Sequence, residues 1–172
     1  RPVRWERKER TVLYAGRLHP EKGIELLLEA WYRRAHGALA GWTLRLVGPV
    51  AVNQGGGGED WADELRKRFA RNDVIWSPPM FDAADLNDAY EAASVFVYPS
   101  LAKRGETFGV APLEAMAWGA VPVVSSLACF RDFIADGVNG VLFDHESPAA
   151  ATNLSEALSS AARVESRALA ER

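Results

Sequence analysis

The sequence predicts an α/β fold in one domain, with a doubly wound parallel sheet covered by helices on both faces. Short runs of β-branched and aromatic residues alternate with longer amphipathic stretches along the chain, and this alternation is typical of such a sheet. The run Val95-Phe96-Val97-Tyr98 is apolar throughout, as expected for a strand that is buried on both sides. The chain has 172 residues, enough for one domain with a full core. We therefore expect a Rossmann-like domain.

Six strands and six helices are expected from these runs. The strands are placed at 11–15, 43–47, 74–77, 95–98, 121–125 and 141–143, and the helices at 24–36, 61–71, 84–92, 112–118, 130–135 and from 147 onward. Ser147 suits the N-cap of the last helix, and Pro148 suits its first helical position. Trp31 and Trp118 lie in apolar stretches and are expected in the core.

The charge balance argues against a protein that binds nucleic acid. The formal net charge is -3, whereas neutralising phosphates requires a basic surface. Cys129 is the only cysteine, so an internal disulfide is impossible and the thiol count fits a reducing compartment such as the cytoplasm. No apolar run reaches the roughly 18 residues of a membrane span.

The opening of the chain is charged and lacks the apolar stretch of a signal peptide. The chain also lacks an initiating Met. We interpret the sequence as a fragment in which residues 1–10 are the remnant of an interdomain linker and residues 11–172 form the ligand-binding domain.

One segment is of low complexity, the glycine run at 55–58. Such a run can cradle a phosphate through its backbone N–H groups. It lacks the Lys and the Ser or Thr of a P-loop, and also the spacing of a dinucleotide fingerprint. We favour a flexible loop, with the phosphate cradle as the alternative.

Two cations follow the first predicted strand. In a parallel sheet, ligands bind outside the carboxyl ends of the strands. Arg17 and Lys22 lie on the loop that leaves the strand at 11–15, directly before a predicted helix. Two cations beside the positive end of a helix suit a diphosphate, although a solvated basic loop is the alternative.

Two carboxylates follow the fourth predicted strand. Glu106 lies in the loop after it, and Glu114 is expected in the first turn of the next helix. A carboxylate there can accept hydrogen bonds from both hydroxyls of a ribose. Gly109 allows the backbone to approach a ligand closely. Alternatively, Glu106 is a surface residue and Glu114 an ordinary carboxylate at a helix start.

Together these segments resemble the donor domain of the retaining group 1 glycosyltransferases, which is the C-terminal half of their GT-B fold. The family pattern has Gly-Arg and then Lys-Gly after the first strand, as at 16–17 and 22–23 here. The strongest match is the run EAMAWGAVPVV at 114–124, which is one residue longer than the family's pattern before its proline. The turns VGP at 47–49 and DGVNG at 136–140 also match, so the resemblance covers essentially the whole chain. It departs from the family at Pro78-Pro79, where a glycine is usual, and at 127–132.

The resemblance implies a role for each matching residue. Arg17 and Lys22 would hold the donor diphosphate, Glu106 would bind the transferred sugar and Glu114 the ribose. The base would lie near Met80 and Phe81. The full set of expected donor contacts is Gly16, Arg17, Lys22, Met80, Phe81, Glu106, Thr107, Phe108, Gly109, Val110 and Glu114, of which Arg17, Lys22 and Glu106 are also expected to be catalytic.

The expected reaction is transfer of a sugar from a nucleoside diphosphate sugar to a glycan, lipid or small-molecule acceptor. No metal or other cofactor is expected, because the sequence has no Asp-x-Asp motif and no His/Cys cluster with ligand spacing. The acceptor, and any peripheral membrane contact, would belong to an N-terminal domain of the same protein. Two alternatives are a nucleotide-binding module without catalytic duty and a nucleotide-sugar epimerase or hydrolase of the same fold.

Overall fold

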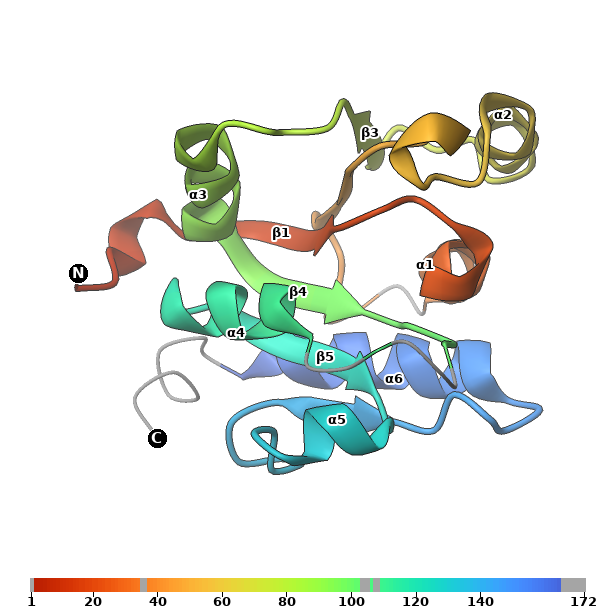
Figure 1. Ribbon diagram of the computed structural model, residues 1–172. Helices are drawn as coiled ribbons and strands as arrows, with labels where there is room; N and C mark the ends of the chain where they lie inside the picture. The colour runs from red at the N-terminus through yellow and green to blue at the C-terminus, as the bar shows by residue number, and fades with distance from the viewer. Residues whose placement is uncertain (1, 35–36, 103–105, 107–108, 165–172) are drawn as a thin grey trace.

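The chain folds around one six-stranded parallel sheet. The computed structural model describes residues 2–34, 37–102, 106 and 109–164. The spatial order of the strands is β3-β2-β1-β4-β5-β6, and all neighbouring pairs are parallel (Figure 1). The strands are β1 Glu9–Ala15, β2 Thr43–Val47, β3 Val74–Ser77, β4 Ala93–Tyr98, β5 Val121–Ser125 and β6 Val141–Phe143. The order turns back between β1 and β4, so the predicted doubly wound sheet is confirmed.

Helices cover both faces of the sheet. On one face α1 packs against α6, which also contacts β4 and β5; α3 and α4 contact each other and lie against β1 and β4 on the other face (Figure 1). The helices are α1 Ile24–Arg33, α2 Glu59–Arg68, α3 Ala83–Ala92, α4 Val110–Ala117, α5 Ala128–Arg131 and α6 Ala150–Arg163. The described residues also form three short 3-10 helices: η1 Trp5–Arg7, η2 Pro20–Lys22 and η3 Val52–Gln54. Among the helices described, none is long and apolar enough to cross a bilayer.

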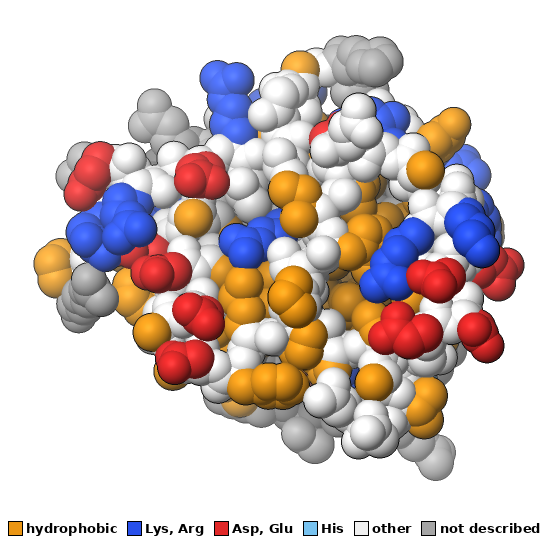
Figure 2. All heavy atoms as spheres, turned by 90° about the horizontal axis from the view of Figure 1, so that it is seen from above, with side chains coloured by type: hydrophobic (Ala, Val, Ile, Leu, Met, Phe, Trp, Pro, Cys, Tyr) orange, Lys and Arg blue, Asp and Glu red, His pale blue; other side chains and the backbone are white. Residues whose placement is uncertain are grey.

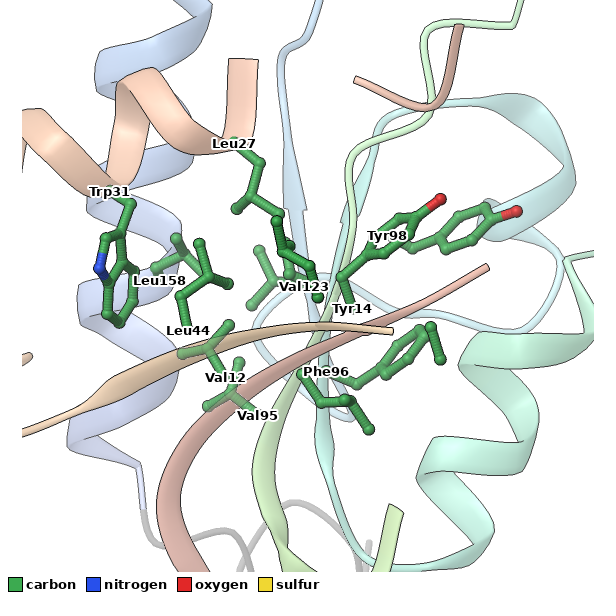
Figure 3. Packing of buried hydrophobic residues seen from close by; sticks show 14 of the residues in the cluster. Val12, Tyr14, Leu27, Trp31, Leu44, Val95, Phe96, Tyr98, Val123 and Leu158 are labelled. Carbon is green, nitrogen blue, oxygen red and sulfur yellow. The ribbon is translucent and has the colours of Figure 1, made fainter. Parts of the chain in front are cut away.

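The core lies between the sheet and these helices. Val12 aligns with Leu44 on β2 and with Val95 on β4, so their side chains form one apolar row across the strands. Figure 3 shows this row beneath α1 and α6. Trp31 is fully buried, as predicted, and burying a side chain of this size contributes about 2–3 kcal/mol. Trp118 is only partly buried, packed against the core from α4's end.

Several element boundaries differ from those predicted. β1 begins at Glu9 rather than at residue 11. The last helix begins at Ala150, so Ser147 is not its N-cap; instead its Oγ accepts a hydrogen bond from Ala149 N in a preceding turn. α5 ends at Arg131 and does not continue to residue 135 as predicted. Asn139 Oδ1 accepts a hydrogen bond from Ala135 N, and its Nδ2 donates to the carbonyl oxygen of Phe133, so these residues are held in a loop.

The glycine run is neither a free loop nor a phosphate cradle. All four of its N–H groups donate to main-chain carbonyls, namely those of Val52, Ala51, Leu18 and Val50 in chain order. A Cβ at Gly56 would lie 2.1 Å from the carbonyl oxygen of Val50. The glycines therefore allow a tightly folded loop, and no N–H group of the run remains for an anion.

The segment before β1 packs against the end of α3. Arg4 and Arg7 both pair with Glu91, which is 2% exposed. Lys8 Nζ donates to the carbonyl oxygens of Tyr90 and Ala93, at 3.3 and 2.7 Å. These bonds satisfy carbonyls that the helix leaves open at its C-terminus.

Candidate functional site

A hollow of about 310 Å³ opens at the carboxyl ends of β1, β2 and β3, beside the point where the strand order reverses. In open α/β sheets this is where ligands bind. The loops after these three strands and the helices α3 and α4 contribute to its wall. The residues that line it are Ala15, Gly16, Arg17, Val47, Gly48, Pro49, Pro79, Met80, Phe81, Leu86, Tyr90, Val110, Ala111 and Glu114.

The floor of the hollow is built of main chain. Gly16 N donates to the carbonyl oxygen of Val47, which joins the loop after β1 to the end of β2. A Cβ at Gly48 would lie 1.8 Å from the carbonyl oxygen of Gly16, and Gly48 has φ 152°. A side chain at this position would force the two loops apart. The sequence motif VGP therefore places bare backbone where a ligand can approach it closely.

Arg17 lines the hollow from the β1–α1 loop. Its guanidinium donates to the carbonyl oxygen of Gly55 at 2.9 Å and to Glu21 Oε1 at 2.8 Å. The side chain is 45% exposed, so its remaining N–H groups reach solvent. A guanidinium has five N–H donors, and the two protein partners hold it in place while leaving donors for an anion.

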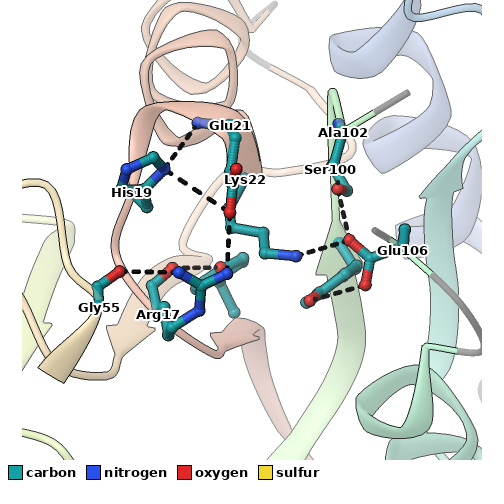
Figure 4. Close-up of polar contacts among 10 residues, drawn as sticks. Arg17, His19, Glu21, Lys22, Gly55, Ser100, Ala102 and Glu106 are labelled. Atoms are coloured by element: carbon teal, nitrogen blue, oxygen red, sulfur yellow. Dashed lines mark hydrogen bonds and ion pairs between the residues drawn. The ribbon is translucent and has the colours of Figure 1, made fainter. Parts of the chain in front are cut away.

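Lys22 and Glu106 form a buried ion pair next to the hollow (Figure 4). Lys22 Nζ lies 2.6 Å from Glu106 Oε2, and both side chains are 9% exposed. Ser100 Oγ donates to the same oxygen at 2.6 Å, and Tyr98 OH lies 3.4 Å from Oε1. Burial lowers the pKa of Lys22, but the hydrogen bond to Glu106 and the nearby negative charge outweigh it, so the net pKa is raised. Lys22 thus differs from Arg17, since it faces Glu106 and is absent from the lining of the hollow.

Two loops meet to form this pair. Gly23 has φ 70°, and a Cβ there would lie 2.0 Å from the carbonyl oxygen of Pro99. Leu101 N donates to the carbonyl oxygen of Glu21 at 2.8 Å. The start of α1 therefore rests directly on the loop after β4, and this contact brings Lys22 to Glu106, 84 residues apart in sequence.

Glu114 projects into the hollow from α4. The helix begins at Val110, so Glu114 lies in its second turn and the predicted first-turn position is wrong. Gly109 is the N-cap with φ 61°, and a Cβ there would lie 2.4 Å from the Phe130 ring. Glu114 is exposed, and Tyr90 OH donates to its Oε2 at 3.2 Å.

The wall opposite the floor is apolar. Met80 and Phe81 follow β3 and line the hollow with Pro79 and Leu86. Phe81 is 76% exposed. In the view from above, hydrophobic side chains gather in the middle of the face, between charged groups on either flank (Figure 2). An apolar wall beside a few polar groups is typical of a site for a small molecule.

Most predicted site residues that can be placed meet at this hollow. Gly16, Arg17, Met80, Phe81, Val110 and Glu114 line it, Lys22 and Glu106 form the adjacent pair, and Gly109 caps α4. Thr107 and Phe108 lie outside the described residues.

Sequence reasoning missed Tyr90, Tyr98 and Ser100. Ser100 could have been found from its place in the loop after β4. Tyr90 carries no such signal in the sequence, because a tyrosine in an amphipathic helix predicts only packing. Over the part of the chain that the structure describes, no three His, Cys, Asp or Glu side chains are grouped as a metal site would require.

Known proteins resemble this chain in sequence. Residues 9–160 match the family described as Glycosyl transferases group 1. The D-inositol 3-phosphate glycosyltransferase of Streptomyces bingchenggensis is 34% identical over 142 residues, which cover 80% of this chain and 30% of that protein. The enzyme of the same name from Frankia alni is 33% identical over 144 residues, covering 80% of this chain and 34% of that protein. The chain thus spans about a third of the length of these relatives.

Solved structures share its fold. The HepE protein of Anabaena in complex with UDP and glucose superposes with a TM-score of 0.76 at 23% identity, covering 95% of this chain and 42% of that one. Sucrose-phosphate synthase from Thermosynechococcus elongatus gives a TM-score of 0.74 at 27% identity, covering 96% and 40%. The predicted fold, one Rossmann-like domain of the kind found in GT-B glycosyltransferases, is confirmed. The chain belongs to the group 1 glycosyl transferases.

Proposed function

We propose that this domain binds the nucleoside diphosphate sugar from which a retaining glycosyltransferase transfers a sugar to a glycan, lipid or small-molecule acceptor. The observation that carries the proposal is the hollow itself. It brings an anion-binding guanidinium, a bare backbone floor, an exposed carboxylate and an apolar wall together at the reversal of the strand order. The guanidinium and the floor suit a diphosphate, the carboxylate suits a ribose, and the apolar wall suits a base.

The nucleotide would lie across the hollow in one direction. The diphosphate contacts Arg17 and the glycine floor, the ribose hydroxyls donate to Glu114, and the base packs against Met80 and Phe81. The Anabaena protein of similar fold, whose structure holds UDP and glucose, supports the binding of a nucleotide by such a domain. The sugar would then extend toward Glu106, beyond the diphosphate.

The chemical contribution of the domain is to stabilise the leaving group. Charge develops on the diphosphate as its bond to the sugar breaks, and cations fixed in place stabilise that charge. Arg17 reaches solvent in the hollow, whereas Lys22 is held by Glu106 at 2.6 Å. Lys22 would therefore share its charge between Glu106 and the diphosphate. With two cations present, we propose that the reaction needs no metal ion.

The acceptor would be bound by a separate N-terminal domain of the same protein, which would also make any peripheral membrane contact. The chain spans about a third of the length of its curated relatives, which supports such a division. We place the reaction in the cytoplasm, in line with a single cysteine in the sequence.

Donor binding can be tested on this domain by thermal unfolding with UDP-, GDP-, ADP- and CMP-sugars. A ligand at about 100 times its Kd adds about 2.7 kcal/mol to stability, which for a domain of this size raises Tm by roughly 5–11 °C. Arg17→Met should abolish the shift. The matched control is Arg68→Met, which changes a similarly exposed arginine on α2 that pairs with Glu25 and Glu29.

Failure of every nucleotide sugar to raise Tm would refute the proposal, and so would an equal loss in both arginine variants. The two alternatives require a product assay on a protein that carries the acceptor region as well. A transferase forms a glycosylated acceptor from the donor. An epimerase or hydrolase yields the epimer or free sugar instead, and a binding module yields no product.

A further inference from the structure

A buried hydroxyl reaches the carboxylate that faces the proposed ribose site. Tyr90, on the last turn of α3, is 2% exposed, and its OH donates to Glu114 Oε2 at 3.2 Å. The tyrosine itself lines the hollow. Burial, and then the charge and hydrogen bond of Glu114, raise the pKa of Tyr90, so the phenol keeps the proton that it donates.

The ring of Tyr90 packs against the sheet, and its backbone is held by the segment before β1. It packs against Phe96 of β4 with ring centroids 5.7 Å apart. Its carbonyl oxygen accepts from Lys8, and the next residue, Glu91, is paired with Arg4 and Arg7. The hydroxyl therefore occupies a fixed point relative to the sheet.

Glu114 has no comparable constraint of its own. It is exposed on α4, and the terminal torsion of a glutamate is broad, so an unrestrained carboxylate samples many orientations. A hydrogen bond to Oε2 restricts the orientations of the carboxylate. It still leaves Oε1 and a second acceptor position on Oε2 for other donors.

We propose that Tyr90 is a positioning residue that orients the Glu114 carboxylate to receive the two hydroxyls of the donor's ribose. This inference rests on the proposed function. It assigns to Tyr90 a role in recognising the ribose diol and not merely in packing α3 on the sheet.

The test compares ribose with dideoxyribose ligands by calorimetry. UDP, GDP and ADP are titrated against this domain, and the tightest binder is then compared with its 2′,3′-dideoxy counterpart. A hydrogen bond to a charged group corresponds to roughly 10- to 150-fold in affinity, so the wild type should prefer the ribose form by at least about tenfold. Tyr90→Phe removes one hydroxyl and keeps the ring. It should weaken the ribose form about three- to tenfold and leave the dideoxy form unchanged.

Three variants complete the design. Tyr32→Phe removes an exposed tyrosine hydroxyl on α1 and should change neither affinity. Glu114→Gln should lose most of the preference for ribose, and adding Tyr90→Phe to it should cause little further loss, because the two residues would act through one carboxylate. Thermal unfolding of each variant checks that it is folded.

The possible results separate the inference from the proposed function. If the wild type prefers ribose and Tyr90→Phe retains the whole preference, the positioning role is refuted while the proposed function stands. If Tyr90→Phe weakens both ligands equally, Tyr90 is structural and the inference is again refuted. If the wild type binds ribose and dideoxyribose forms equally, or binds no nucleotide, both the ribose contact and the inference fail.

Discussion

Glu106→Ala should destabilise the domain strongly, because it leaves a buried ammonium without its counter-ion. The Lys22 and Glu106 side chains are each 9% exposed, and Nζ lies 2.6 Å from Oε2. Removing one partner of a buried pair costs about 3–5 kcal/mol. The hydroxyls of Ser100 and Tyr98 would lose their acceptor as well. We therefore expect the upper part of this range.

Lys22→Met should cost less than Glu106→Ala. It leaves Glu106 with the hydroxyl donors of Ser100 and Tyr98. Glu106→Ala instead leaves the Lys22 ammonium beside the neutral Tyr98, whose ring centroid lies 5.6 Å away, and removes the carboxylate that balances its charge. The double variant should cost less than the sum of the two single variants, by about 1–3 kcal/mol for residues in direct contact.

Urea unfolding of the four proteins measures this cycle. For a domain of this size, a loss of 3 kcal/mol corresponds to a fall in Tm of about 6–12 °C, which thermal scans would detect independently. Two single variants whose costs simply add in the double variant would refute the pairing. A cost for Glu106→Ala below that of Lys22→Met would refute the argument from the hydroxyl donors.

Three further outcomes are expected. Hydrogen bonds from Arg71, and then the nearby Arg34, hold the pKa of Asp73 at about 2 against the effect of burial, so its contribution is present above about pH 4 and is lost as the pH falls toward 2. In urea unfolding, Asp73→Asn should therefore lower the free energy of unfolding by about 1–2 kcal/mol at pH 7 and leave it unchanged near pH 2. The control Glu64→Gln, on the exposed face of α2, should not show this dependence on pH. A cost of Asp73→Asn that is the same at both pH values would contradict the argument. Gly23→Ala should destabilise the domain by several kcal/mol and lower its affinity for nucleotide, because Gly23 has φ 70° and the added Cβ would lie 2.0 Å from the Pro99 carbonyl oxygen. A variant with the wild-type Tm would show that the start of α1 and the loop after β4 can separate freely. EDTA should leave the affinity for nucleotide sugars unchanged in calorimetry, and recovery of lost binding by added Mg²⁺ or Mn²⁺ would reject a site without metal.

The sheet was predictable because its strands are short apolar runs separated by helical patterns. β2, β3, β5 and β6 have the predicted bounds. Helix ends were less accurate where side chains compete with the backbone. Ser147 forms a turn before α6 instead of capping it, and Asn139 holds residues beyond α5 in a loop. Such local bonds depend on which residues meet in space, and periodicity does not contain that information.

Most residues of the site could be predicted from the sequence, but the contacts between them could not. Arg17 and Glu114 were placed correctly after β1 and on α4, since ligands lie at the carboxyl ends of parallel strands. That Lys22 would face Glu106 could not be foreseen, because the contact depends on α1 resting on the loop after β4. The glycine run was misinterpreted because its N–H groups bond carbonyls that sequence patterns do not reveal, three of them earlier in the same loop and one, that of Leu18, on the loop after β1.

The hollow has a floor made of main chain and a wall made of side chains, and the two can change independently in evolution. Gly16 and Gly48 meet backbone to backbone, so this part of the surface presents main-chain groups and no side chains. Met80 and Phe81 lie on a different loop and present side chains only. On the proposed function, a descendant of this sequence could acquire a preference for another base by changes confined to the loop after β3. The contacts proposed for the diphosphate lie on other loops and would be inherited unaltered, so selectivity and anchoring could evolve independently.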